Sequence, residues 1–484
     1  MNRIVTVAEA KAFDRFCIEQ RHIPSRTLMA TAAEGVFRAV LRLRKDQQPV
    51  TVLAGSGNNG GDGVAAALLL HRAGIPVTVS LLGDAAKTTA DTAAYLSAAR
   101  DAGVSIETAW KPRSEALLVD ALLGVGLTRD VSGRLAEVIS QINASGCTVV
   151  SVDVPSGLDA DTGCVCGAAV RAFLTVTMQY MKTGLLLGQG RAYAGDVTVT
   201  PLAAEDGYAF SETRWLQSED EVQALLPPRP FDSHKGANGH ALLCVGSPKY
   251  IGAALLSSRA ALRSGCGLLT VVTPNPVRGA FSALPEAITV PTGTADWDAC
   301  ACEAAIAALD NKTAIGVGCG VGDGTIAPLL KAALSTKRPL VLDADALNQL
   351  AKSPALVGLL HENVVLTPHV GEMARLLGCS IAQVQADPLS AASSFPCTVL
   401  LKGATTLVHE RHRTAFCVGG NAGLAKGGSG DVLTGIITAL LAQGLTPFDA
   451  ARVGAHLLGV RADRAMNLLG ERMLLASDLL DVVL

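Results

Sequence analysis

Short apolar runs alternate with longer amphipathic stretches along almost the whole chain. In the first half, the runs at 49–54, 76–82, 117–123 and 148–154 are rich in Val and Leu and predict buried strands, while 63–73 has the periodicity of a helix. Strands that alternate with helices in this way form parallel sheets with helices on both faces. We therefore expect an α/β protein.

The alternation breaks near residue 226 and then starts again. Prolines at 227, 228 and 230 can continue neither a helix nor a central strand. We interpret this run as a domain boundary or its flank, and we expect domains at 1–211 and 212–484, each long enough to bury its own core. Six later apolar runs predict strands at 241–246, 268–273, 314–318, 340–343, 364–367 and 399–402.

Composition and charge exclude several classes of protein. The 484 residues include 40 basic and 43 acidic side chains, for a net charge of -3, which excludes a strongly basic nucleic-acid binder. The longest uncharged stretch, 432–448, is shorter than the ~20 apolar residues of a membrane span, and charged residues interrupt the N-terminus where a signal peptide would be apolar. We expect a cytoplasmic homo-oligomer with neither a membrane nor a nucleic-acid partner.

Cysteine and histidine give only weak signals for metal binding. The twelve cysteines contain no C-x-x-C, and the C-x-C pairs at 164/166 and 300/302 are better interpreted as free thiols in a reducing compartment. His409 and His412 form an H-x-x-H beside two charged residues. We expect a solvated hairpin there rather than a zinc site.

A glycine-rich turn follows the first predicted strand. Residues 55–63 read G-S-G-N-N-G-G-D-G and open a helix, as a dinucleotide-binding turn does. Glycines let the backbone approach a pyrophosphate, and the helix N-terminus offers free N–H groups. The alternative is a tight turn in which Asp62 caps the helix. The amides of Asn58 and Asn59 could also ligate a hard cation.

Two aspartates, Asp120 and Asp153, lie at the ends of later strands in the first half. Ligands of open α/β sheets bind at the carboxyl ends of the strands. We therefore expect Asn59, Asp120 and Asp153 to converge on one site. The alternative for each of them is a turn-forming role.

Three motifs in the first half resemble the NAD(P)H-hydrate epimerase domain family. They are G-x-G-N-N-G-G-D-G, D-A-L-L-G-x-G and V-D-x-P-S-G, within about residues 1–210. The resemblance implies a Rossmann-like three-layer sandwich, Asp153 as the acid/base, and a potassium ion held by Asn59, Asp120 and Ser156. Many relatives have a Glu where this chain has Ala30, which removes a polar group from that helix. The implied hydrate-binding residues are Asn58, Asn59, Gly60, Gly61, Asp62, Gly124, Val125, Gly126, Leu127, Thr128, Arg129, Asp130 and Asp153.

The second half has a different glycine-rich turn, G-G-S-G-D at 427–431, which opens an apolar helix over 432–442. Free N–H groups and the helix dipole favour an anion there, and Asp431 could accept a proton from an attacking hydroxyl. The alternative is that Asp431 only caps the helix. Lys402 follows a predicted strand and suits a nucleotide phosphate, and the alternative is an ordinary hairpin turn. His369 also follows a predicted strand and suits a polar ligand, and the alternative is a structural role.

Further motifs in the second half resemble the ribokinase-like fold and, within it, the ADP- or ATP-dependent NAD(P)H-hydrate dehydratase family. They are H-K-G at 234, A-A-L-R-S-G-C-G at 260, D-A-D-A-L-N at 343, T-P-H-x-G-E, K-G-A and G-G-S-G-D. Cys319 and Ala422 stand where relatives have proline, and neither change removes a chemical group. The resemblance implies hydrate contacts at Ala253, Gly320, His369 and Asp431, and ADP contacts at Lys402, Gly403, Ala404, Thr405, Thr406 and Gly430.

Together the two halves predict a bifunctional metabolite-repair enzyme. It would interconvert the R and S hydrates of NADH and NADPH and dehydrate the S form at the expense of ADP or ATP, with magnesium on the nucleotide phosphates. The choice between ADP and ATP stays open. The alternatives are a vitamin or sugar kinase fused to a nucleotide-binding module, and a non-catalytic ligand sensor. The first-half motifs argue against the kinase, and the intact Asp153 and Asp431 argue against the sensor.

Overall fold

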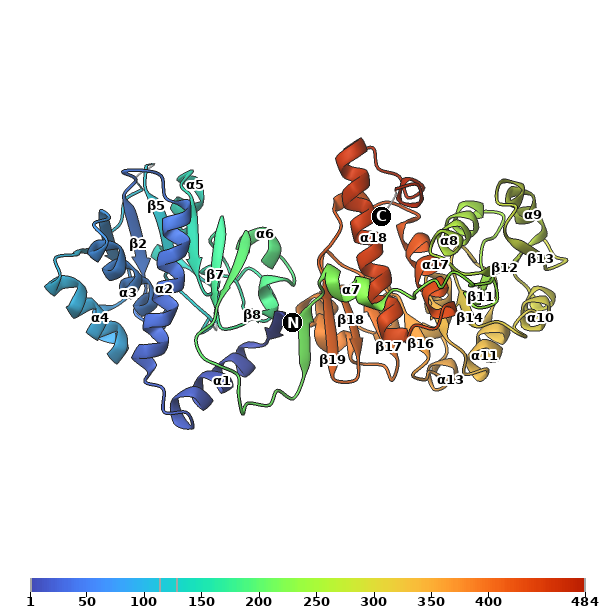
Figure 1. Ribbon diagram of the computed structural model, residues 1–484, viewed down its shortest axis with the longest axis horizontal. Coiled ribbons are helices and arrows are strands. Elements are labelled where there is room, and N and C mark those ends of the chain that lie inside the picture. The colour runs from blue at the N-terminus through green and yellow to red at the C-terminus, as the bar shows by residue number, and fades with distance from the viewer. Residues whose placement is uncertain (1, 113–114, 128, 483–484) are drawn as a thin grey trace. The chain divides into compact units, whose positions relative to one another are not determined.

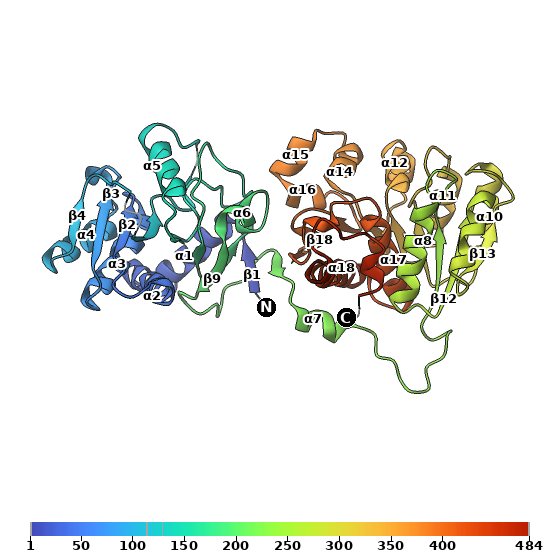
Figure 2. The same ribbon diagram turned by 90° about the horizontal axis from the view of Figure 1, so that it is seen from above.

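The computed structural model describes residues 2–112, 115–127 and 129–482, and the chain divides into two compact units. These are Met1–Thr213, here the N-terminal unit, and Arg214–Leu484, the C-terminal unit. Figures 1 and 2 show that each unit has its own sheet with helices on both sides. No helix within the described residues is long and apolar enough to cross a membrane.

The N-terminal unit is built on a parallel sheet with the strand order β4-β3-β2-β5-β6-β7-β9. The central strands are buried on both faces, which explains why their sequences are continuous apolar runs. The four strands predicted here are confirmed to within two residues at each end. The strands are β2 (Val50–Ala54), β3 (Val77–Leu81), β4 (Ser105–Glu107), β5 (Leu117–Ala121), β6 (Val149–Val152), β7 (Leu174–Met178) and β9 (Asp196–Thr200).

Helices cover both faces of this sheet and make the predicted three-layer sandwich. α2 (Ser25–Leu43), α3 (Asn58–Arg72) and α4 (Ala90–Asp101) share one apolar core with the strands, and α5 (Gly133–Ala144) packs in a second core on the other face (Figure 2). The remaining elements are the parallel pair β1 (Asn2–Val5) and β8 (Met181–Lys182), α1 (Val7–Glu19) and α6 (Gly190–Ala194).

The C-terminal unit contains a longer, mixed sheet, ordered β13-β12-β11-β14-β15-β16-β17-β18-β19-β10. It is parallel from β13 to β17, and β17, β18 and β19 are antiparallel. The six predicted strands are confirmed. The strands are β10 (Thr213–Leu216), β11 (His240–Cys244), β12 (Leu268–Thr273), β13 (Ile288–Pro291), β14 (Ala314–Val317), β15 (Leu340–Leu342), β16 (Val364–Leu366), β17 (Thr398–Leu401), β18 (Thr406–Glu410) and β19 (Arg413–Cys417).

Three long helices, α8 (Ile251–Arg263), α17 (Ser429–Ala442) and α18 (Pro447–Leu469), pack on one face of this sheet in a large apolar core. Figure 2 shows α12 and α14 across the sheet from α17 and α18. The other helices are α7 (Glu219–Leu225), α9 (Asn275–Arg278), α10 (Ala299–Ala307), α11 (Ala327–Ser335), α12 (Asp345–Ala351), α13 (Pro354–Val357), α14 (Val370–Leu377), α15 (Ile381–Ala386) and α16 (Pro388–Ala392).

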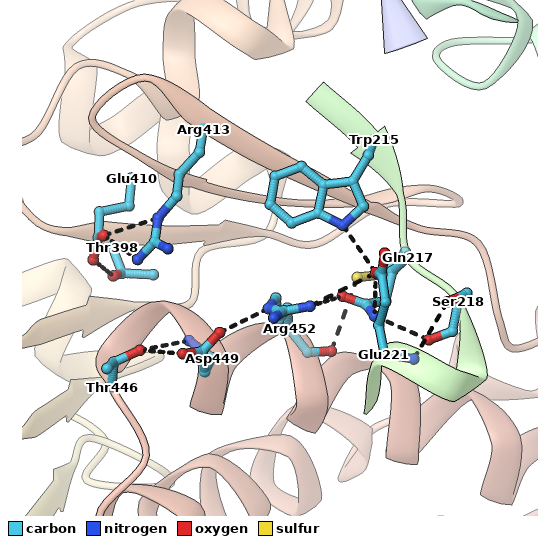
Figure 3. A network of polar contacts seen from close by, with 11 residues as sticks. Trp215, Gln217, Ser218, Glu221, Thr398, Glu410, Arg413, Thr446, Asp449 and Arg452 are labelled. Atoms are coloured by element: carbon cyan, nitrogen blue, oxygen red, sulfur yellow. Dashed lines mark hydrogen bonds and ion pairs between the residues drawn. The ribbon is translucent and has the colours of Figure 1, made fainter. Parts of the chain in front are cut away.

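A polar network fixes the start of the C-terminal unit to α18 (Figure 3). Arg452 donates from Nη1 to Gln217 Oε1 at 2.6 Å and from Nε to Asp449 Oδ1 at 2.9 Å. Trp215 Nε1 donates to Glu221 Oε2 at 3.1 Å. These contacts attach β10 and α7 to the unit before the chain reaches the proline run.

The hairpin predicted at the H-x-x-H motif is present as β18 and β19, but it is not solvated throughout. His409 is buried on β18, and its ring Nδ1 pairs with Thr414 Oγ1 of β19 at 2.9 Å. The expectation of a solvated His409 is therefore wrong, because the strand alternation turns this residue toward a covered face. Within the described residues, no group of three or more His, Cys, Asp or Glu is arranged to hold a metal ion.

Candidate active sites

A cavity of about 610 Å³ lies at the carboxyl ends of the strands in the N-terminal unit. Residues following β2, β3, β5 and β6 line it, together with α1, α2 and the first turns of α3. Its volume is in the range of small-molecule sites. Its polar lining residues include Lys11, Asp14, Ser25, Ser56, Asn58, Asn59, Asp62, Thr89, Asp91 and Asp153.

The glycine-rich turn becomes helical earlier than predicted. α3 begins at Asn58 rather than near residue 63, with Gly57 as its N-cap and no side-chain cap. Asn58, Asn59 and Asp62 therefore lie in its first turns and line the cavity. The alternative in which Asp62 caps the helix is wrong.

Gly60 and Gly61 lie on the opposite, buried side of α3 and do not line the cavity. A Cβ at Gly60 would lie 2.0 Å from the carbonyl oxygen of Gly55, and one at Gly61 would lie 2.5 Å from Thr92 Oγ1. Glycine is therefore needed here because α3 packs closely on the preceding turn at Gly60 and on Thr92 of α4 at Gly61.

The loop after β5 and the helix α2 form two further walls of the cavity. The loop lines the cavity with Gly124, Val125, Gly126 and Leu127. Of the other predicted residues in this loop, Arg129 and Asp130 do not line the cavity, and Thr128 lies outside the described residues. α2 contributes Ser25, Leu28, Met29 and Ala32. Ala30, which replaces the glutamate of relatives, is exposed, so α2 borders the cavity mainly with apolar side chains.

Asn59, Asp120 and Ser156 meet around the backbone of Leu123. The Ser156 hydroxyl lies 2.5 Å from Asp120 Oδ1 and accepts a hydrogen bond from Leu123 N at 2.8 Å. Asn59 Nδ2 donates to the Leu123 carbonyl at 3.0 Å. The expected convergence of Asn59 and Asp120 is thus present in the fold.

Asp120 is fully buried and saturated with hydrogen bonds. Besides the Ser156 hydroxyl, its oxygens accept from the backbone N–H of Ser156 at 2.9 Å, from Ser151 Oγ at 2.8 Å and from Leu122 N at 3.3 Å. Burial raises the pKa of Asp120, and these hydrogen bonds lower it in part. A carboxylate has about four acceptor positions, so a cation bound to Asp120 would replace one of these donors.

The Ser156 hydroxyl is the donor best placed to give way to a cation. It also lies 3.1 Å from the Leu123 carbonyl, and its one proton can serve only one of the two acceptors. Around it are carboxylate, hydroxyl, carbonyl and amide oxygens. This donor set fits a hard monovalent ion better than zinc.

Asp153 follows β6 in a left-handed backbone conformation, with φ of 65°. Its Oδ1 accepts hydrogen bonds from Lys182 Nζ at 2.5 Å, Met178 N at 3.0 Å and Thr177 Oγ1 at 3.1 Å. Asp153 lines the same cavity as Asn59. Lys182 was not among the predicted site residues, because it lies on the short strand β8 with no motif around it.

The cavity brings several acidic groups together. Burial raises the pKa of Asp62 well above 3.8, the carboxylates of Asp153 and Asp14 raise it further, and the Lys182 ammonium lowers it. Burial also raises the pKa of Asp14, with Lys182 opposing the effect. The cavity therefore favours protonated carboxyl groups around the Asp153–Lys182 pair.

In the C-terminal unit, Asp431 is the third residue of α17, whose N-cap is Gly428 with φ of 101° and no side-chain cap. The alternative in which Asp431 caps the helix is therefore wrong. Burial raises the pKa of Asp431 to about 6, the carboxylate of Asp343 adds to the effect, and Lys402 opposes it. A carboxylate with such a pKa can act as a general base near neutral pH.

A buried carboxylate, Asp343, organises the groups around Asp431. Lys402 Nζ donates to Asp343 Oδ1 at 2.9 Å, and Thr434 Oγ1 of α17 donates to Oδ2 at 2.7 Å. Burial lowers the pKa of Lys402, but the carboxylates of Asp343 and Glu372 outweigh this effect, so the pKa of Lys402 is raised overall. Lys402 is therefore a firmly cationic group held by an ion pair at the base of α17.

Other predicted residues lie around this ion pair. A Cβ on Gly430 would lie 3.5 Å from Lys402 Nζ, and one on Gly320 would lie 2.7 Å from Ala253 Cβ. Cys319 Sγ is 4.0 Å from Asp343 Oδ2 and brings the loop with Gly320 to the same place. The structure thus gathers these residues at the carboxyl ends of β14, β15 and β17.

His369 and the turn at 402–405 adjoin the site. The backbone N–H of Lys402 donates to the Pro368 carbonyl at 2.8 Å. His369 caps α14, and its Nδ1 accepts from Gly371 N at 3.0 Å while half of the side chain stays exposed. Residues 402–405 form the turn between β17 and β18, so the backbone here is the hairpin turn named above as the alternative. The Lys402 side chain nevertheless reaches Asp343.

Both units match known protein families. Residues 25–184 match the family described as YjeF-related protein N-terminus, and residues 241–483 match the family described as NAD(P)H-hydrate dehydratase. The Bifunctional NAD(P)H-hydrate repair enzyme Nnr of Coxiella burnetii is 38% identical, over 97% of this chain and 96% of its own length. The enzyme with that name from Escherichia coli is 37% identical, over 93% and 87%.

Among solved structures, the ADP/ATP-dependent NAD(P)H-hydrate dehydratase from Bacillus subtilis, co-crystallized with ATP/Mg2+, is 31% identical with a TM-score of 0.49. It corresponds to 55% of this chain and 95% of its own. The full-length relatives confirm the resemblance predicted from the motifs of both halves. The chain belongs to the family of bifunctional NAD(P)H-hydrate repair enzymes, with an epimerase activity and an ADP/ATP-dependent dehydratase activity.

Proposed function

We propose that the dehydratase reaction takes place at the Asp431 site and that Asp431 is its general base. Asp431 accepts the proton of the S-hydrate hydroxyl while the hydroxyl oxygen attacks the terminal phosphorus of the nucleotide. The bond between that phosphorus and the bridging oxygen breaks, releasing the shortened nucleotide. The phosphate ester then loses inorganic phosphate and a ring proton to regenerate NAD(P)H. The observation that supports this role is the pKa of about 6 at Asp431, beside the Asp343–Lys402 ion pair.

The residues around Asp431 divide into two groups by position. Ala253, Gly320 and His369 provide the wall for the hydrate. Lys402, the turn through Gly403, Ala404, Thr405 and Thr406, and Gly430 at the start of α17 face the nucleotide, since free N–H groups at a helix N-terminus favour phosphate. Magnesium bound to the nucleotide would neutralise part of its phosphate charge.

For the epimerase reaction, Asp153 is the acid/base in the N-terminal cavity. Asn58, Asn59, Asp62 and the loop 124–127 line the same cavity and bind the hydrate. Asn59, Asp120 and Ser156 would hold a potassium ion, which would supply positive charge near the substrate. The resemblance adds Thr128, Arg129 and Asp130 to the proposed binding residues, although Arg129 and Asp130 do not line the cavity and Thr128 lies outside the described residues.

The proposal is tested by supplying the purified protein with racemic NADH hydrate and magnesium, with either ADP or ATP. Return of the reduced-nicotinamide absorbance with at least one nucleotide, and its loss in Asp431→Asn, is the expected result. A variant with unchanged recovery would show that the base is another residue.

A further inference from the structure

The ion pair between Lys182 and Asp153 is unusually enclosed for two charged groups. The Lys182 side chain is 3% exposed, and that of Asp153 is 13% exposed. The three protons of the Lys182 ammonium have three acceptors, Asp153 Oδ1 at 2.5 Å, Met178 O at 2.8 Å and Thr177 Oγ1 at 3.3 Å. The lysine is thus held in one orientation.

The two oxygens of Asp153 have different surroundings. Oδ1 accepts three hydrogen bonds, from Lys182 Nζ, Met178 N and Thr177 Oγ1. Within the described residues, Oδ2 accepts none, although Asp153 lines the 610 Å³ cavity. Oδ2 is therefore the oxygen available to a ligand in that cavity.

Stability alone explains this pair poorly. Desolvation offsets much of the attraction in a buried ion pair, and apolar replacements are often as stable. The left-handed backbone of Asp153, with φ of 65°, adds strain at the same residue. Strain of this kind persists where the surrounding structure holds a functional group in place.

Titratable groups of both kinds surround Asp153. Asp14 and Lys11 face the cavity from α1, and Asp62 faces it from α3. A second, small cavity of about 50 Å³ also touches Lys11, Asp14, Asp153 and Lys182. Among the described residues, Lys182 is the cation in direct contact with Asp153.

We propose that Lys182 is a positioning residue of the epimerase, which holds Oδ1 of Asp153 in place and turns its Oδ2 into the cavity. This inference rests on the proposed role of Asp153 as the acid/base. Without Lys182, the Asp153 carboxyl group would lose its charged partner and would rotate away from its fixed orientation. Proton transfer to and from the hydrate would then be slow even though the hydrate still binds.

The experiment compares Lys182→Met, Lys182→Gln and Lys182→Arg in the full chain, with racemic hydrate, magnesium and the nucleotide, ADP or ATP, that supports recovery in the wild type. The fast phase reports dehydration of the S form and serves as a folding control, and the later phase reports epimerisation. Lys182→Met and Lys182→Gln should lower the epimerisation kcat about 100-fold with KM changed less than about three-fold. The matched control is Lys87→Met, which removes an exposed lysine paired with Asp84.

Two readouts separate positioning from a purely structural role. The loss in Lys182→Gln should lie in kcat rather than in KM, because the hydrate still binds while the acid/base is misplaced. Lys182→Arg keeps the charge and the donors, so it should recover much of the epimerisation rate that Lys182→Gln loses.

A wild-type epimerisation rate in Lys182→Gln would overturn the inference, as would a loss confined to KM or a Lys182→Arg variant as slow as Lys182→Gln. If Lys182→Met does not fold, Lys182→Gln and Lys182→Arg decide the question. Undiminished epimerisation in Asp153→Asn would instead show that the proposed acid/base is wrong, so the two failures are distinguishable.

Discussion

Replacing Asp431 by Asn should raise the stability of the protein while abolishing dehydration. The pKa of Asp431 is raised from 3.8 to about 6, first by burial and then by Asp343. The folded state therefore binds this proton more tightly than the unfolded chain. The stability gained from protonation is fully present below pH 3.8 and is lost as the pH rises through about 6.

The magnitude follows from the same two values. Each pH unit between them is worth about 1.4 kcal/mol, so at pH 7.5 the ionised Asp431 weakens the fold by about 3 kcal/mol as an upper limit. Asn removes this charge, and it also loses a favourable interaction of about 0.5 kcal/mol with the helix N-terminus. The net gain corresponds to a rise in melting temperature of about 5 °C.

Activity should change in the opposite direction. Asn cannot take the hydroxyl proton, so dehydration should fall by about 100-fold or more. In the wild type, kcat/KM for the S hydrate should decline as the pH falls through about 6, because the base becomes protonated. The assays are thermal unfolding at pH 7.5 and recovery of reduced-nicotinamide absorbance between pH 5 and 8. A lower melting temperature together with retained activity would refute this reasoning.

Three further outcomes are expected. Asp120→Ala should remove the response of epimerisation to potassium, measured against sodium, and a response that survives would exclude Asp120 as a ligand. The same change should lower the free energy of unfolding of the N-terminal unit by about 3 kcal/mol, because it leaves buried donors of Ser151 and Ser156 unpaired. Arg452→Met should lower the free energy of unfolding by about 2–4 kcal/mol in a denaturant titration, because it breaks the contacts with Gln217 and Asp449. It should leave the dehydration kcat unchanged, because none of these three residues belongs to the proposed site. Gly320→Ala should raise KM for the hydrate, because its φ of 65° and the nearby Ala253 leave no room for a methyl group; an unchanged KM would place the hydrate elsewhere.

Much of the sheet in each unit could be predicted, because buried parallel strands are short apolar runs. The predictions failed where local sequence does not determine backbone geometry. α3 starts at Asn58 because Gly57 takes the N-cap position, although the glycines that follow are poor helix formers. The edge strands β13 and β9 were not predicted, since partly exposed strands have no continuous apolar run.

The candidate sites were predictable only where a motif carries the chemistry. Asp431 and Asp153 follow glycine-rich or strand-end patterns that point to a ligand. Lys182 and Asp343 depend on tertiary contacts, Lys182 with Asp153 and Asp343 with Lys402. No spacing along the chain predicts that a lysine 29 residues after an aspartate will pair with it.

The assignment of the two reactions to the two sites can be measured most directly with Asp153→Asn and racemic hydrate, in the presence of magnesium and the nucleotide, ADP or ATP, that supports recovery in the wild type. This variant keeps the dehydratase site and loses the proposed acid/base of the epimerase. The predicted trace is biphasic: the S hydrate is recovered at the wild-type rate, and the R hydrate follows only at the uncatalysed rate of epimerisation. Mixing in Asp431→Asn protein, which retains Asp153, should restore complete recovery in the fast time range. Complete fast recovery by Asp153→Asn alone would contradict the assignment of epimerisation to the N-terminal cavity.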